Sequence, residues 1–350
     1  MSIGRGTFSP ARDEHVDVRS FGADVTDSDC TAAFQQAADV AAASGGVMFI
    51  PAGTWTVTGT VTFQAGVTVR GAGAGATTVN HTGNNPCFDF DLGGSYTVTN
   101  GVEGIRITGN SGAAGVGLQV SDTWGFRIRN VTISGYTNGV GLKLYNRSHW
   151  TEGTEATGLW IRNCGTGISF MRSQAADGNT DSFGYTRLLN VGINVPAGGT
   201  GIFFGDDAEH DATHYIYNCE IHANIWLAKN AVAMEFSSNS TGDGNHLHVT
   251  GENESGATGT RAWAAEAPGF FNFTGAVAVA ADNTDFPSEV NSFLVFGDYR
   301  SGVKVQVGSA TPEGDVSAPV GSIFIRNDGG AGSTLYVKES GTGNTGWAAK

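Results

Sequence analysis

Two glycine-containing insertions in the 350-residue chain carry the residues best suited to acid–base chemistry. They span 171–185 and 196–215, and they contain Asp181, Asp206 and Asp207. Cleavage of a glycosidic bond needs one carboxylic acid to protonate the leaving oxygen and a second carboxylate to activate water or attack carbon. Long insertions in a compact repeat protein are more often functional than ordinary connections. These three aspartates could supply such carboxyl groups if the protein cleaves a glycan.

A lyase mechanism is the alternative for the same loops. It needs a base near the C5 proton of a uronate, often arginine or lysine, and a cation that neutralises the carboxylate. Arg172 or Arg187 could supply the base, and the acidic run at 206–211 could hold the cation. Solvated acidic loops on an acidic protein explain the same residues without any catalysis. Both the presence and the type of enzyme activity stay open at this point.

Histidines stand beside these acids and on a later strand. His210 and His214 are four residues apart, and His246 and His248 would share one strand face. Such pairs can bind divalent metals. Because exposed polar loops explain both pairs equally well, the sequence predicts neither a metal site nor a cofactor. We expect His210 and Arg187 to contact a bound glycan instead.

Tryptophans offer a second kind of chemistry, the stacking of sugar rings. Indole faces suit this because they combine a large apolar face with a polar edge. Trp160 alternates with Leu159 and Ile161, so it should point outward from its strand. We predict Trp160 and Trp226 as carbohydrate contacts, with packing at a subunit interface as the alternative. Four tryptophans lie in or beside the repeated segment: Trp124, Trp150, Trp160 and Trp226.

The composition excludes several classes of partner. The formal net charge is -14, and the chain has no run of lysine and arginine that could neutralise a phosphate backbone, so no nucleic acid is expected. No apolar run is long enough to cross a bilayer, and the N-terminus lacks the apolar core of a signal peptide. The 4 cysteines are scattered without a Cys-x-x-Cys pair, which indicates small buried side chains rather than a disulfide framework or a zinc site.

A short pattern recurs from residue 60 to about 250: an apolar residue, a variable residue, Asn, then Val or Cys. Its asparagines are Asn130, Asn163, Asn190 and Asn218, spaced 27 to 33 residues apart, which suits one supersecondary unit repeated as a coil. In the segment 126–133 the alternation of apolar and polar residues shifts by one position at residues 129–130. Such a shift occurs at a bend between two strands. Asn tolerates the left-handed backbone of such a bend and can bond a matching Asn one level up. We predict one asparagine stack through all four positions.

One Ala-rich helix precedes this repeat. Its start is indicated by N-cap residues at 27–29 and its end by the glycine pair at 45–46. Phe34, Ala37, Ala38 and Ala41 fall at i, i+3, i+4 and i+7, and so form a narrow stripe that can lie flat on another surface. The first coil of a parallel β-helix exposes strand edges. We expect the helix to cover that open end.

The run from Val18 to Trp55 contains FGAD, TAAFQQAADVAAASGG and VMFIPAGTW. It resembles the start of pectate-lyase-superfamily right-handed β-helices, a group common in bacteriophage tail spikes and in secreted polysaccharide-acting enzymes. The resemblance covers about residues 16–250. The segment from Pro319 to Lys350 is similar to one that closes many phage structural proteins. Together the two resemblances imply a component of a virion tail, synthesised in the host cytoplasm and trimeric like its relatives.

A second resemblance concerns the acidic insertions. The triplets NTD at 179–181 and GDD at 205–207 are similar, in order and spacing, to the carboxylate motifs of polygalacturonase-like glycoside hydrolases. This resemblance implies that Asp181, Asp206 and Asp207 are the catalytic residues. The chain has neither the Gly-His-Gly nor the Arg-Ile-Lys element that this family carries further on. A histidine from elsewhere, His210, His222 or His246, would have to take that role.

The predicted fold is all-β, a right-handed single-stranded parallel β-helix with an N-terminal α-helix cap and a small β-rich C-terminal module. The predicted divisions are an N-terminal arm for virion attachment at 1–16, the β-helix at 17–252 with its capping helix at 28–44, a β-rich continuation or trimerisation region at 253–318, and the module at 319–350. The predicted role is a phage tail spike or tail fibre that recognises host-surface polysaccharide; a polysaccharide depolymerase is the alternative. The predicted partners are that polysaccharide, other tail proteins bound through the arm, and further copies of the chain in a homotrimer, with no membrane.

Overall fold

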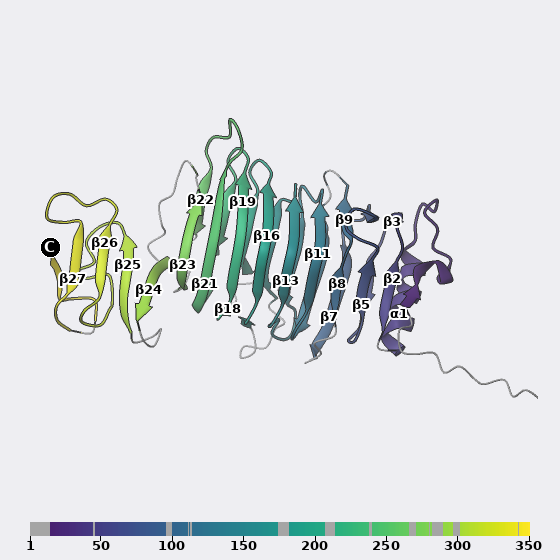
Figure 1. Ribbon diagram of the computed structural model, residues 1–350, viewed down its shortest axis with the longest axis horizontal. Coiled ribbons are helices and arrows are strands. Elements are labelled where there is room, and N and C mark those ends of the chain that lie inside the picture. The colour runs from purple at the N-terminus through teal and green to yellow at the C-terminus, as the bar shows by residue number, and fades with distance from the viewer. Residues whose placement is uncertain are drawn as a thin grey trace, which may run out of the picture.

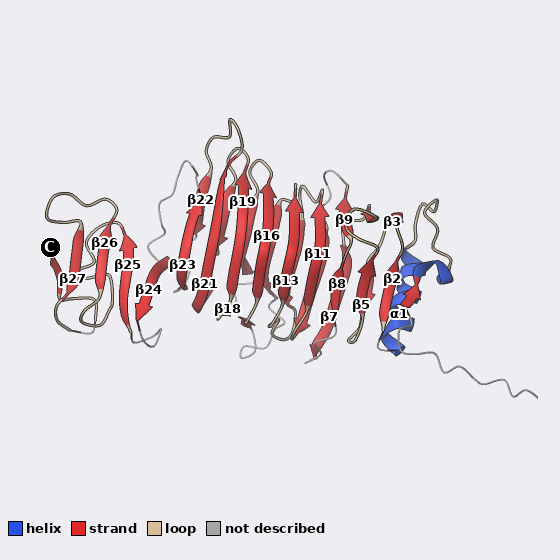
Figure 2. Ribbon diagram, viewed as in Figure 1, coloured by secondary structure: helices blue, strands red, loops and turns tan. Residues whose placement is uncertain are grey.

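The body of the molecule is a right-handed parallel β-helix, which confirms the predicted fold class (Figure 1). One α-helix lies at one end of the strand stack and a small C-terminal group of strands at the other (Figure 2). The computed structural model describes residues 15–44, 46–95, 100–110, 112, 114–173, 182–206, 214–237, 240–265, 271–279, 281, 290–296, 302–341 and 343–350.

Two long parallel sheets wrap around the core. In sheet B each strand pairs with the equivalent strand one coil further on; its strands are β4 (Val61–Phe63), β7 (Pro86–Ser95), β10 (Val116–Thr123), β12 (Val140–Asn146), β14 (Thr166–Arg172), β17 (Thr200–Asp206), β20 (Val232–Phe236) and β22 (Arg261–Ala265). The main series of sheet A is β1 (His15–Asp17), β2 (Val47–Ile50), β5 (Thr68–Gly71), β8 (Gly101–Glu103), β11 (Arg127–Ser134), β13 (Glu155–Arg162), β16 (Arg187–Val195), β19 (Glu220–Leu227), β21 (Ser240–Asn253) and β23 (Phe271–Val279). Shorter members of sheet A are β3 (Gly53–Val57), β6 (Thr77–His81), β9 (Arg106–Gly109), β15 (Ser182–Gly184) and β18 (His214–Tyr217).

Inward side chains stack in register from coil to coil and form the core. Phe170, Phe204 and Phe236 are paired across β14, β17 and β20, and all three are fully buried. The ring centroids of Phe170 and Phe204 lie 5.0 Å apart, and those of Phe204 and Phe236 lie 4.9 Å apart with an interplanar angle of 10°. Burial of each such ring contributes roughly 2 to 3 kcal/mol. The core thus fixes which residues of each strand are left to face solvent.

The change of inward phase within β11 is confirmed. Ile128 and Val131 are both fully buried, although they are an odd number of positions apart, because Asn130 adopts a left-handed conformation with φ of 51°. The other three pattern asparagines, Asn163, Asn190 and Asn218, also have φ between 50° and 56°. Asparagine therefore does make the bends that the sequence pattern indicated.

The predicted stack of four asparagines is wrong. Residues 129 and 131 pair with 157 and 159, so Asn130 faces Gly158, and Asn190 follows Gly158 in the next coil. A Cβ atom added to Gly158 would lie 2.8 Å from Oδ1 of Asn130, so the asparagine side chain occupies the space above its neighbour and requires glycine there. Asn163 and Asn218 belong to two other bends, opposite Gly135 and Gly244.

The helix α1 (Thr31–Ser44) covers the first coil, as predicted. Its buried residues are Phe34, Ala37, Ala38 and Ala41, the four positions of the apolar stripe. Gln35 completes the cap, because β4 is an edge strand of sheet B. Its Oε1 accepts from the backbone N–H of Thr62 at 2.8 Å and its Nε2 donates to the Thr62 carbonyl at 3.0 Å. The amide of Gln35 thus satisfies backbone groups that a neighbouring strand would otherwise pair.

The C-terminal strands form a small module of mixed direction. β24 (Val290–Phe296) pairs with β23 in parallel and with β25 (Val303–Gly308) in antiparallel, and β26 (Ile323–Arg326), β27 (Leu335–Lys338) and β28 (Trp347–Ala349) follow. Phe324, Tyr336 and Trp347 form its own small core. The 4 cysteines are buried and unpaired, as predicted. No helix in the described part of the chain has the length and hydropathy needed to span a membrane.

Candidate functional site

The structure does not test the predicted catalytic carboxylates. Asp181, Asp207 and His210 lie outside the described residues. Asp206 is the last residue of β17, where its backbone pairs with that of Arg172 at the end of β14, but its side chain is not described. A catalytic role for the three aspartates and glycan contact by His210 stay predictions.

Arg187, a predicted glycan contact, belongs to a column of alternating charge on the outer face of sheet A. Consecutive coils place Arg127, Glu155, Arg187 and Glu220 in register. Nη1 of Arg127 lies 3.2 Å from Oε2 of Glu155, and Nε of Arg187 lies 3.8 Å from Oε2 of Glu220. The guanidinium of Arg187 is therefore partly neutralised by a neighbour in its own sheet, and its contact with a glycan remains untested.

Histidines extend this face into the next coils. His222 lies beside His246 and His248, with ring centroids 5.8 and 5.6 Å apart, and its Nε2 is 3.2 Å from Oε1 of Glu220. Across the described residues, no group of three or more His, Cys, Asp or Glu side chains is arranged to hold a metal ion.

Trp160 and Trp226 come together, which the sequence could not establish. Trp160 points outward from β13 with 45% of its surface exposed, as its alternation with buried Leu159 and Ile161 predicts. Its indole is stacked on that of Trp226 from β19, two coils away, with ring centroids 6.0 Å apart and an interplanar angle of 16°. β13, β16 and β19 lie side by side in the stack (Figure 1).

Gly192 makes this contact between distant coils possible. It pairs with Trp160 on the intervening strand β16, and a Cβ atom at this position would lie 2.6 Å from Cε3 of Trp160. Since glycine has no side chain, the indole of Trp160 can lie across β16 toward Trp226. A side chain at residue 192 would have to displace the ring.

Arg162 and Asn194 complete a surface hollow of about 280 Å³ with the two tryptophans. Arg162, Asn194 and Trp226 are in register on three consecutive strands. Asn194 donates from Nδ2 to Oε1 of Glu254 at 2.5 Å, which orients its amide. Arg162 is exposed, and the described residues give it no ion-pair partner. We call these four residues the tryptophan hollow; it offers aromatic faces beside amide and guanidinium donors.

The sequence signal for Arg162 was the same alternation that placed Trp160 outward, because residues 160 and 162 share one strand face. Asn194 and Gly192 carried no comparable signal. Their position beside the tryptophans depends on the register between coils, and an Asn or a Gly in a glycine-rich chain is not distinctive by type.

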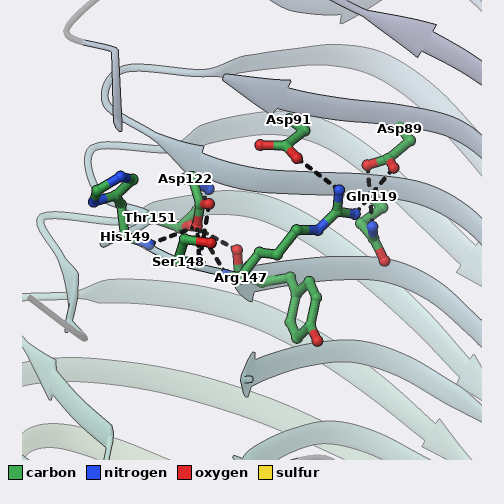
Figure 3. Close-up of polar contacts among 9 residues, drawn as sticks. Asp89, Asp91, Gln119, Asp122, Arg147, Ser148, His149 and Thr151 are labelled. Atoms are coloured by element: carbon green, nitrogen blue, oxygen red, sulfur yellow. Dashed lines mark hydrogen bonds and ion pairs between the residues drawn. The ribbon is translucent and has the colours of Figure 1, made fainter. Parts of the chain in front are cut away.

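A second polar cluster lies on the outer face of sheet B (Figure 3). Arg147, just after β12, reaches across β10 to β7, where its Nη1 lies 2.6 Å from Oδ2 of Asp91 and its Nη2 lies 3.1 Å from Oδ2 of Asp89. Gln119 on β10 donates from Nε2 to Oδ1 of Asp89 at 3.0 Å. We call Asp89, Asp91, Gln119 and Arg147 the arginine clamp. One guanidinium holds both carboxylates as ion-pair partners, and this contact fixes the position of all three side chains.

Asp122 organises the loop that carries Arg147. It has a left-handed backbone with φ of 51°, and its carboxylate accepts from the backbone N–H groups of Arg147, Ser148 and His149 at 2.8 to 3.1 Å. The N–H of Asp122 donates to Oγ1 of Thr151 at 2.9 Å. Burial raises the pKa of the Asp122 carboxyl, although the three N–H donors oppose that shift. These contacts explain the arginine clamp as a structural device.

Comparison with known families gives one match. Residues 15–101 match the family model described as rhamnogalacturonase A/epimerase, pectate lyase-like. This confirms the resemblance that the opening motifs indicated, over the capping helix and the first coils. No curated protein matches the chain.

Several solved structures are similar to the chain at low sequence identity. A tailspike protein of E. coli bacteriophage HK620 is 12% identical, over 80% of this chain and 65% of that one, with a TM-score of 0.45. The surface adhesin PfbA of Streptococcus pneumoniae is 13% identical over 96% and 98%, with a TM-score of 0.41. The A-module of a mannuronan C-5 epimerase from Azotobacter vinelandii is 14% identical over 80% and 98%, with a TM-score of 0.32. Residues 15–101 are therefore similar to a pectate-lyase-like family model, and the body of the described chain is a parallel β-helix.

Proposed function

We propose that this protein recognises a host-surface polysaccharide through the tryptophan hollow, as part of a bacteriophage tail spike or tail fibre. The observation that carries the proposal is the stacked pair of Trp160 and Trp226, open to solvent on a rigid sheet. Exposing a large aromatic surface to water is unfavourable. Such a surface on a folded protein therefore often marks a site that a ligand covers.

The hollow suits a sugar in size and in chemistry. Ligand sites are concave and mostly apolar, with a few polar groups that fix orientation. The two indoles supply the apolar faces, and Arg162 and Asn194 supply donors for ring and hydroxyl oxygens. Because all four residues project from strands of one sheet, the site needs little ordering when it binds, which favours affinity.

Assembly and location belong to the same proposal. Residues 1–16 would attach the protein to other tail proteins, and three copies would associate along their β-helices. This arrangement follows from the resemblance of the opening motifs to those of bacteriophage tail spikes and from that of 319–350 to the end of phage structural proteins. Side by side in a trimer, the copies would present three equivalent hollows to a repetitive glycan, and such multivalency raises overall affinity.

Binding can be measured with surface polysaccharides purified from a panel of candidate bacterial hosts, using immobilised glycan and purified protein. We expect at least one polysaccharide to bind. Trp160→Ala and Trp226→Ala should each weaken this binding about 30-fold, because a buried aromatic contact commonly contributes 2 kcal/mol or more.

Val307→Ala is the matched control, since Val307 is an exposed apolar residue, 48% accessible, in the C-terminal module. It should bind like the unaltered protein. Wild-type affinity in both tryptophan variants, with circular dichroism unchanged, would exclude the tryptophan hollow as the binding site.

Depolymerase activity is the second candidate function. It is favoured by the position of Asp206, which ends β17 in register with the buried Arg172 of β14. In the same incubations, new reducing ends that form without ultraviolet-absorbing products and disappear in Asp206→Asn and Asp207→Asn would establish hydrolysis. Ultraviolet-absorbing unsaturated ends would indicate a lyase. Binding without any shortening of the chains would leave recognition as the function and remove the three aspartates from it.

A further inference from the structure

Five aromatic side chains gather on a different part of the coil, before the strands of sheet A that carry the tryptophan hollow. The ring of Tyr185 lies 5.6 Å from that of Trp124 and 5.3 Å from that of Tyr217, measured between centroids. Trp150 lies 6.2 Å from Trp124, edge to face, and Tyr215 is stacked 5.5 Å from Tyr217. We call these five residues the aromatic shelf.

Tyr185 is the unusual member, because its backbone is left-handed with φ of 53°. The residues at the same bend in neighbouring coils are Gly125, Gly153, Asn218 and Gly244, which are the types that adopt this conformation most readily. A tyrosine there is strained. It is also 47% exposed, so burial of its ring does not offset the strain. The backbone geometry therefore favours glycine or asparagine at this position.

A buried carboxylate lies against the shelf. Glu152 is 7% exposed, and its Oε1 accepts from the hydroxyl of Tyr217 at 2.9 Å and from that of Ser182. Burial, and then the bond to Glu152, raise the pKa of the Tyr217 hydroxyl, which therefore stays a donor at neutral pH. Among the described side chains, hydrogen bonds reach only Oε1 of Glu152. Its Oε2 is the acceptor that a ligand hydroxyl could use.

From these contacts we infer that the aromatic shelf is a second carbohydrate-binding site, which takes an uncharged pyranose residue. The apolar face of the sugar would lie on Tyr185 and Trp124, and one hydroxyl would donate to Glu152. A neutral sugar fits because a buried carboxylate disfavours an anionic one. The inference rests on the proposed recognition of polysaccharide, but it concerns residues that the tryptophan hollow does not use.

Saturation-transfer NMR can measure sugar binding to the aromatic shelf alone. The probes are the β-methyl glycosides of glucose and galactose and the α-methyl glycoside of mannose. The measurement uses the full chain carrying Trp160→Ala and Trp226→Ala, so that the tryptophan hollow cannot contribute. We expect transfer from the protein to at least one glycoside. Adding Tyr185→Gly should reduce that transfer about fivefold or more, because the main stacking surface is lost.

The same variant separates function from structure. Since glycine relieves the left-handed strain, Tyr185→Gly should keep the melting temperature or raise it. Glu152→Gln, which retains an acceptor oxygen but loses the charge, should weaken transfer less than Tyr185→Gly does. The inference would be overturned if the protein with an intact shelf showed no saturation transfer to any of the three glycosides. Transfer that stays unchanged in Tyr185→Gly would overturn it as well. Failure of the proposed function would give a different result: the polysaccharide would bind equally well after both tryptophans of the hollow are replaced.

Discussion

The tryptophan hollow and the arginine clamp are built in the same way on the two different sheets of one β-helix. Each joins side chains from three consecutive strands, β13, β16 and β19 in the hollow and β7, β10 and β12 in the clamp. In each, one long side chain reaches over the middle strand: the indole of Trp160 in the hollow and the guanidinium of Arg147 in the clamp. They differ in whether these groups satisfy one another.

In the clamp the polar groups bind one another, since one arginine pairs with two aspartates and a glutamine donates to one of them. In the hollow the indole faces stay open, and no carboxylate among the described residues pairs with Arg162. A self-satisfied cluster adds stability and offers a ligand little, whereas unsatisfied aromatic and donor groups on a rigid surface gain from binding one. Two clusters of the same construction therefore differ in role: the clamp stabilises the fold, and the hollow is available to a ligand.

Removing the clamp should have the largest effect, and only on stability. Arg147→Met leaves Asp89, whose side chain is 11% exposed, beside Asp91 without a cation. Unfolding free energy should fall by about 2 kcal/mol, the usual cost of an unpaired and largely buried polar group. Denaturant unfolding checks this, with Arg129→Met on β11 as the matched control for losing an exposed arginine. Polysaccharide binding should not change; if it falls tenfold, the clamp takes part in recognition and the contrast fails.

Adding a side chain at Gly192 should have the opposite effect, because it should lower binding affinity rather than stability. A methyl group in Gly192→Ala displaces Trp160, because the added Cβ would lie 2.6 Å from its ring. Affinity for the polysaccharide should fall about tenfold with little loss of stability, since the ring can move outward into solvent. Gly75→Ala is the control, where a Cβ meets nothing within 4 Å. Tight binding by Gly192→Ala would mean that the stacked geometry is not what the ligand recognises.

The smallest effect should come from the loop beneath the clamp, and it depends on pH. Burial raises the pKa of Asp122, so the folded protein disfavours its ionised form. The resulting penalty is fully present above the folded-state pKa and disappears as pH falls toward the unfolded value near 3.8. Asp122→Asn removes the charge and keeps an acceptor oxygen, and asparagine tolerates the left-handed backbone.

That variant should therefore be more stable than the wild type by less than about 1 kcal/mol at pH 7, with the gap closing toward about pH 4. Unfolding measured at both pH values gives the difference directly. A gap that widens as the pH falls would show that the ionised carboxylate stabilises the loop, so that the three N–H donors outweigh burial. Polysaccharide binding should be the same in both proteins.

Much of the fold could be predicted because its signals are local. The stripe of Phe34 and three alanines identified the capping helix, and the phase change around Asn130 identified a bend. The asparagine stack failed because the pattern was assumed to return at the same bend in each coil. Loops of different length place Asn163 and Asn218 at other bends, and the space that Asn130 fills requires glycine beside it.

The candidate site was likewise predictable only in part from the sequence. Acidic residues in insertions attracted a catalytic prediction, which the described residues leave untested, whereas the outward direction of Trp160 followed from simple alternation. Arg162 lies on the same strand face and could have been added by that rule. Tyr185 could not, because a tyrosine in a turn is ordinary until its left-handed backbone and its glycine neighbours are known.

The sequence by itself determined which side chains of each strand enter the core and which face water, since alternation is a property of a single strand. Only the tertiary structure decided that Trp160 meets Trp226 across Gly192, that Arg147 reaches Asp89 and Asp91, and that Tyr185 lies beside Trp124 and Tyr217. Those contacts depend on the register between coils about thirty residues apart in sequence. Core packing and loop length fix that register jointly, and no local pattern encodes it.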